Sequence, residues 1–68
     1  MIASPVLYAK GYSKTDGETP IYFWGLGSYR YEIESRPLSS SNYSVIFESS
    51  YEEAMKKFED KIDMKTGV

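Results

Sequence analysis

The fold is decided by residues 20–35 of this 68-residue chain, PIYFWGLGSYRYEIES. Apolar and charged side chains alternate with a period of two from Tyr29 to Ser35, which is typical of a half-buried antiparallel strand. Ile21 to Trp24 are strong strand formers that are apolar on both faces, so we expect a strand that is central or covered. Gly25-Leu26-Gly27-Ser28 predicts the turn between them. It is not interpreted as a phosphate loop, because a strand and not a helix N-terminus follows it.

Two further strands flank this hairpin in the sequence. A strand is predicted from Val6 to Tyr12, and a turn-rich loop that contains Asp16-Gly17 follows it. Alternation places Leu7, Ala9 and Gly11 on one face and Val6, Tyr8, Lys10 and Tyr12 on the other. After a loop with Pro37 and several serines, Tyr43 to Phe47 predicts a fourth strand.

A helix is expected to follow the fourth strand. Ser50 and Glu53 form a capping box, in which the serine hydroxyl accepts from the N–H of Glu53. Apolar residues then recur at steps of three and four, which indicates one apolar stripe; they are Tyr51, Ala54, Met55, Phe58 and Ile62. Lys61 and Lys65 suit the C-terminal end, and Gly67 is the expected stop.

The predicted fold class is α+β, with one domain over residues 1–68. We expect a four-stranded antiparallel β-meander with one C-terminal α-helix packed on one face, in the order β-β-β-β-α. The predicted core is Leu7, Ile21, Phe23, Ile33, Val45, Phe47, Ala54, Met55, Phe58 and Ile62.

Composition restricts the chemistry. The chain has seven tyrosines, three phenylalanines and one tryptophan, but no histidine and no cysteine. No histidine is present to activate a serine, and no Cys/His set is present for zinc. We therefore expect no enzymatic activity, no cofactor and no metal. Glu32 and Glu34 point the same way on one strand, and we interpret them as a solvated face with Arg30 as partner, not as an acid–base pair or a Mg²⁺ or Ca²⁺ site.

Charge and hydropathy bear on location and partners. Residues 1–31 hold three bases and two acids, and residues 32–68 hold five bases and eight acids. Because this pattern lacks a basic cluster, nucleic acid is a less favoured partner than protein. Residues 1–5 lack the basic and apolar regions of a signal peptide, and no apolar run is long enough to span a bilayer. We expect a small soluble domain in the cytoplasm that does not bind a membrane.

The aromatic residues predict a binding surface. Because one helix covers only one face of the sheet, we expect the other face to expose Tyr8, Tyr12, Tyr22 and Trp24. Together with Arg30, these residues form the predicted binding surface. Tyrosine and tryptophan are enriched at interface hot spots. The first hypothesis is a protein-binding module whose partner is a host protein or a second copy in a homodimer. Three alternatives stay open: half-buried tyrosines without a partner, a single-stranded nucleic-acid binder that stacks bases, and a homo-oligomer whose aromatic face is only structural.

The C-terminal pattern resembles that of small phage and prophage accessory proteins. The resemblance covers residues 20–62 and is carried by aromatic strands followed by Val45-Ile46-Phe47-Glu48-Ser49-Ser50-Tyr51-Glu52-Glu53-Ala54. It implies an accessory protein of a virus or mobile element that binds, and thereby inhibits, a host protein.

Overall fold

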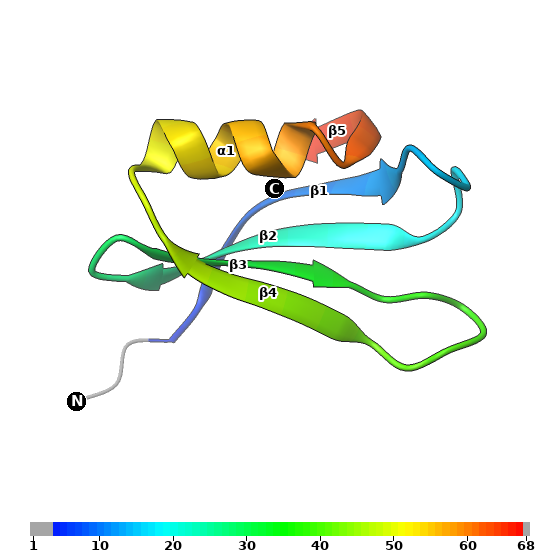
Figure 1. The fold of residues 1–68 in the computed structure, drawn as a ribbon, viewed down its shortest axis with the longest axis horizontal. Coiled ribbons are helices and arrows are strands. Elements are labelled where there is room, and N and C mark those ends of the chain that lie inside the picture. The colour runs from blue at the N-terminus through cyan, green and yellow to red at the C-terminus, as the bar shows by residue number, and fades with distance from the viewer. Residues whose placement is uncertain (1–3, 68) are drawn as a thin grey trace.

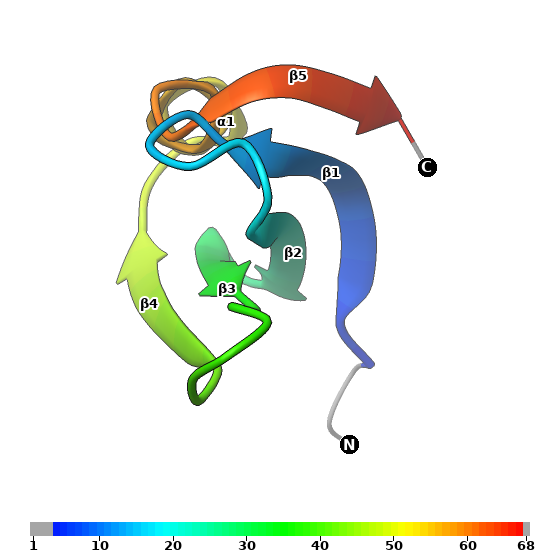
Figure 2. The ribbon, with the colours of Figure 1, turned by 90° about the vertical axis from the view of Figure 1, so that its right-hand side faces the viewer.

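A computed structural model describes residues 4–67, and the side chains of residues 4–63. Figures 1 and 2 show an antiparallel sheet curled into a half-barrel, with one helix on its inner side. The elements are β1 Val6–Ser13, β2 Pro20–Gly27, β3 Arg30–Ser35, β4 Tyr43–Glu48, α1 Tyr51–Glu59 and β5 Ile62–Gly67. Residues 1–3, which entered the signal-peptide expectation, lie outside the described residues.

The sheet order is β4-β3-β2-β1-β5 with all neighbours antiparallel. The small α+β class and the meander of the first four strands are as expected from the sequence. The prediction of four strands is wrong, because the chain returns after the helix and adds β5 to the outer side of β1.

The helix is shorter than the sequence pattern indicated. It begins after Ser50, whose hydroxyl accepts from the N–H of Glu53 at 3.3 Å, so the predicted cap is confirmed. It ends at Glu59, and Lys61 N–H donates to the carbonyl of Phe58 at 3.0 Å as the chain turns. Ile62 is buried as predicted, but it is the first residue of β5 and not part of the helical stripe. Pairing with β1 satisfies backbone groups that would otherwise lie at an open edge.

The core lies between the sheet and α1. Phe23 and Phe58 are its largest fully buried side chains, and their rings stack with centroids 5.4 Å apart. Phe47 and Met55 pack partly buried against this core. Val45 was predicted to be buried but is 54% exposed, because it lies on edge strand β4. The buried apolar residues are Ala9, Ile21, Phe23, Tyr31, Ile33, Ala54, Phe58 and Ile62.

A bulge in β1 changes the expected faces of that strand. Leu7 pairs with Trp24 and Ala9 pairs with Phe23, so Tyr8 is the extra residue between them. One inserted residue reverses the alternation on one side of the bulge. Leu7 therefore shares the face of Trp24, turned away from the helix, and its predicted place in the core is wrong.

Tyr8 lies on the helix side of the sheet because of the same bulge. Its ring centroid is 5.8 Å from that of Phe23 and 5.4 Å from that of Tyr51, the latter edge to face. A Cβ atom on Gly25 would overlap the Tyr8 ring. The glycine thus makes room for this ring, which gives it a packing role that the predicted turn did not include.

The β2–β3 turn lies later than predicted. A second bulge between Gly25 and Gly27 lets β2 continue to Gly27, and the two turn residues are Ser28 and Tyr29. Both have positive φ, 54° and 61°, the sign that a type I′ hairpin turn requires. Tyr29 is therefore a turn residue, and β3 begins at Arg30.

Candidate functional site

The sheet face turned away from α1, here called the outer face, carries a mixture of rings and charges. Cross-strand pairs define its members, because residues directly opposite each other share a face. Lys10 lies opposite Tyr22, and Trp24 lies opposite Glu32. By the same registers the outer face holds Leu7, Lys10, Tyr12, Pro20, Tyr22, Trp24, Arg30, Glu32, Glu34, Ser44, Ile46 and Glu48.

Cations and rings alternate across this face. The ammonium of Lys10 lies 5.7 Å from the ring centroid of Tyr12 and 5.6 Å from that of Tyr22. The guanidinium carbon of Arg36 lies 4.3 Å from the centroid of Tyr22. All three distances are within the range of cation–π attraction. Strands β1 and β2 and the residue after β3 therefore contribute one continuous row, Tyr12, Lys10, Tyr22 and Arg36.

Glu34 connects this row to the tryptophan. Its Oε1 atom accepts from the indole Nε1–H of Trp24 at 2.9 Å and from Nη2 of Arg36 at 3.0 Å. The hydrogen bond from Arg36 lowers the pKa of the Glu34 carboxyl, and that from Trp24 adds to it, although partial burial acts in the opposite direction. One carboxylate oxygen thus fixes two side chains. We call Lys10, Tyr12, Tyr22, Trp24, Glu34 and Arg36 the ring–cation cluster.

The structure places four of the five predicted binding-surface residues on the outer face, and three of these four belong to the ring–cation cluster. Tyr12, Tyr22 and Trp24 share the outer face; Tyr12 is 39% exposed, and the other two are half-buried. Tyr8 lies on the opposite side of the sheet, because of the β1 bulge. Arg30 lies at the start of β3 and forms an exposed ion pair with Glu48 at 3.8 Å, outside the ring–cation cluster.

Sequence reasoning missed the partner of Glu34. We expected Arg30, but the structure pairs Glu34 with Arg36. The sequence spacing could have predicted this pair, because Arg36 is two residues after Glu34, and residues two apart lie on the same face of an extended chain. The backbone does stay extended here, because Arg36 N–H donates to the carbonyl of Pro20 at 3.0 Å and continues the ladder one residue beyond β3.

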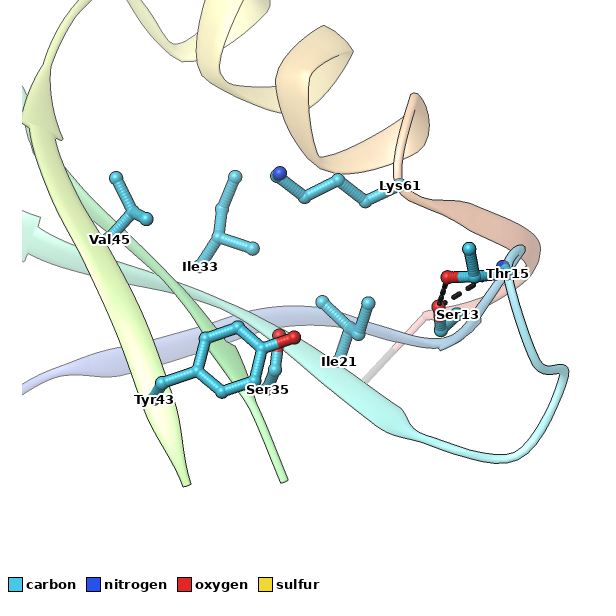
Figure 3. A pocket seen from close by; sticks show the side chains of 8 residues that line it. All are labelled: Ser13, Thr15, Ile21, Ile33, Ser35, Tyr43, Val45 and Lys61. Carbon is cyan, nitrogen blue, oxygen red and sulfur yellow. Dashed lines mark hydrogen bonds between the residues drawn. The ribbon is translucent and has the colours of Figure 1, made fainter. Parts of the chain in front are cut away.

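A small pocket opens on the helix side (Figure 3). Its volume is about 150 Å³, below the 300–1,000 Å³ usual for ligand pockets. It accommodates a group the size of one side chain. In Figure 3 the Lys61 side chain reaches across the pocket above Ile21 and Ile33, while Ser13 and Thr15 hydrogen-bond to each other at 2.6 Å. The lining residues are Ser13, Thr15, Ile21, Ile33, Ser35, Tyr43, Val45 and Lys61.

The pocket and the ring–cation cluster differ in the polar groups that they bring together. The pocket lining contains hydroxyls and the amine of Lys61, but no carboxylate or imidazole. In the ring–cation cluster, the Glu34 oxygen is already occupied by two donors. Within residues 4–63, no three His, Cys, Asp or Glu side chains are grouped so as to hold a metal ion.

Comparison with other proteins gives no relative. No family model, curated protein or solved structure matches the chain significantly. In the described part of the chain, no helix is long and apolar enough to cross a membrane, since α1 has only nine residues.

Proposed function

We propose that this chain is a non-enzymatic protein-binding module that contacts its partner through the ring–cation cluster. The observation that carries the proposal is that one Glu34 oxygen holds both Trp24 and Arg36. Tryptophan, tyrosine and arginine are the residues most enriched at hot spots. Side chains that are already held in place lose less conformational entropy on binding, so more of the contact energy is available for affinity.

The charges on the cluster favour a protein over a nucleic acid. The outer face carries three cations, Lys10, Arg30 and Arg36. Three carboxylates on the same face, those of Glu32, Glu34 and Glu48, offset them. Single-strand binding surfaces combine stacking rings with a continuous positive groove. The outer face has the rings without that groove, so we propose a partner with a mixed polar and apolar surface.

The resemblance to phage and prophage accessory proteins extends this proposal. On that basis the partner is a host protein in the cytoplasm, and binding inhibits it. This part of the proposal depends on the resemblance, whereas the choice of the outer face depends on the geometry of the cluster.

Comparative affinity capture tests the proposal. Immobilised wild type, Trp24→Ala and Arg36→Ala proteins are incubated with lysate of the source cell, and retained proteins are quantified by mass spectrometry. A true partner should be lost from both variants, since a hot-spot truncation costs about 2 kcal/mol or more, roughly thirtyfold in affinity. Leu38→Ala is the matched control, because Leu38 is 79% exposed in the β3–β4 loop and is not a member of the cluster.

Folding must be checked for each variant by circular dichroism. A folded Trp24→Ala or Arg36→Ala protein that retains every partner of the wild type would refute the proposed surface. A parallel titration with labelled oligothymidine at low salt tests the nucleic-acid alternative. Tight binding that weakens steeply with added salt would replace the protein-binding proposal with that alternative.

A further inference from the structure

Strand β4 has an open edge. Among the described strands only β3 pairs with it, while the opposite edge of the sheet is β5. Ser49 N–H donates to the carbonyl of Tyr29 at 2.9 Å, which fixes which residue pairs are hydrogen-bonded. Because bonded and non-bonded pairs alternate in an antiparallel ladder, Tyr43, Val45 and Phe47 direct their backbone groups toward β3. Outward-directed backbone groups therefore belong to Ser44, Ile46 and Glu48.

Strand β4 itself lacks the usual protection against pairing, although Lys57 of α1 lies beside it, with its ammonium 5.5 Å from the ring centroid of Phe47. Natural proteins place lysine, proline or a bulge on such strands. The sequence of β4, YSVIFE, contains no lysine and no proline, and its pairing with β3 has no register shift. Ile46 on the outer face is 58% exposed, and Val45 on the helix side is 54% exposed. The strand therefore offers both backbone hydrogen-bonding groups and apolar side chains to another strand.

We propose that a second copy of this chain occupies the β4 edge, antiparallel, with a twofold axis at Ile46. Outward-directed residues must pair with outward-directed residues, so Ile46 lies opposite Ile46 of the second copy. Ser44 then lies opposite Glu48, and on the helix side Val45 lies opposite Phe47. The result is one continuous sheet across two molecules.

Charge and apolar matching select this register over its neighbours. A twofold axis at Phe47 would place the carboxylate of Glu48 against Ile46. An axis at Val45 would place the hydroxyl of Ser44 against Ile46. Only the axis at Ile46 brings the exposed Ile46 side chains together while keeping the two Glu48 carboxylates apart, each opposite a neutral serine.

The small size of the contact is typical of weak association. β4 has six residues. An edge-to-edge contact of this length is at the small end of specific interfaces, below about 1,200 Å². We therefore expect reversible association with a dissociation constant of the order of 100 μM.

The dimer has a consequence for the outer face, and this consequence alone rests on the proposed function. The twofold axis of an antiparallel edge-to-edge pair is perpendicular to the sheet, so both outer faces point to the same side. Each dimer then presents two ring–cation clusters in one direction. Bivalent engagement of a partner raises affinity without any new contact.

Sedimentation equilibrium over about 5 μM to 1 mM tests the dimer, since this range spans the expected dissociation constant. Wild type should pass from monomer to dimer. Ile46→Lys places a charge at the twofold axis and should raise the dissociation constant at least tenfold. Leu38→Lys adds the same charge at an exposed loop residue and should leave association unchanged.

Ser44→Pro provides the second, backbone-specific variant. It removes an N–H that is directed away from β3, so the ladder keeps its bonds while the edge loses one donor. A wild-type protein that stays monomeric over the whole range would overturn the proposal. So would a dimer that Ile46→Lys leaves intact and Trp24→Ala abolishes, because the outer face would then be the interface.

Discussion

The packing of Tyr8 against Gly25 leads to a prediction that tests the β1 bulge. Gly25 pairs with Val6 and Tyr31, and an added Cβ would overlap the Tyr8 ring. Gly25 has no positive φ, so the backbone itself accepts an L side chain. Gly25→Ala should therefore disturb the structure through one contact, by pushing the Tyr8 ring away from Phe23.

The magnitude follows from two opposing effects. Overpacking costs about 1–3 kcal/mol at a well-packed site, and we expect a cost at the lower end here, about 1 kcal/mol, because the far end of the 41% exposed Tyr8 side chain can shift. Alanine in a strand interior gains about 0.5–1 kcal/mol over glycine when nothing is in the way. In the Tyr8→Ala background the obstacle is gone, so Gly25→Ala should become neutral or stabilising. The coupling between the two substitutions is then roughly 1 kcal/mol, within the range seen for residues in contact.

The cycle is measured by urea unfolding of the wild type, the two single variants and the double variant. Trp24 is the one tryptophan in the sequence and follows unfolding by fluorescence. A chain of this length should have a total stability of roughly 3–10 kcal/mol, so all four proteins can remain folded. Equal costs of Gly25→Ala in the presence and absence of the Tyr8 ring would refute the placement of that ring and the bulge that produces it.

Three further predictions follow from local features. Replacing Ser28-Tyr29 with Asn-Gly should stabilise the protein by about 1–2 kcal/mol in urea unfolding, because both positions have positive φ; loss of stability would argue against the I′ turn. Hydrogen bonds from Thr19 and Glu18 lower the pKa of Asp16 from 3.8 to about 2. The contribution of Asp16 to the free energy of unfolding is therefore fully present above pH 3.8 and is lost as the pH falls toward 2. Asp16→Asn should make the free energy of unfolding less dependent on pH in that window, and an unchanged pH dependence would contradict this. Phe58→Ala should cost about 3–5 kcal/mol or abolish folding, judged by circular dichroism, since its ring is fully buried; a cost below about 1 kcal/mol would show that it is not in the core.

The sequence predicted those parts of the fold whose signal is local. The alternation of β3 and the Ser50 cap each occupy a few consecutive residues, and both are confirmed. The fifth strand was missed because two periodicities overlap at Ile62. This residue is four positions after Phe58, as in a helical stripe. It also begins, with Asp63, an alternation of apolar and charged residues that is typical of a strand. Pairing with β1, a long-range effect, decided between the two.

The candidate site was predicted in part for the same reason. Alternation within β2 placed Tyr22 and Trp24 on one face, and the register with β1 brings Tyr12 to that face. The position of Tyr8 depends on whether its ring fits over Gly25. This contact joins two strands, so the sequence pattern of either strand alone does not predict it. Arg36 was missed because Pro37 marks a loop, although the ladder continues to Arg36.

The open β4 edge also bears on how so small a domain stays folded. A chain of this length buries only about 60% of its unfolded surface, and this one has no cysteine to cross-link it. If two copies pair through β4, mass action couples association to folding. At a total concentration about ten times the dissociation constant, about one chain in five stays monomeric. The folded state then gains about 1 kcal/mol, which raises the unfolding midpoint by roughly 4–8 °C. The midpoint of wild type should therefore rise with protein concentration, whereas that of Ile46→Lys should not. Equal midpoints at low concentration would show that Ile46→Lys acts on pairing and not on the fold, and a wild-type midpoint independent of concentration would contradict the coupling.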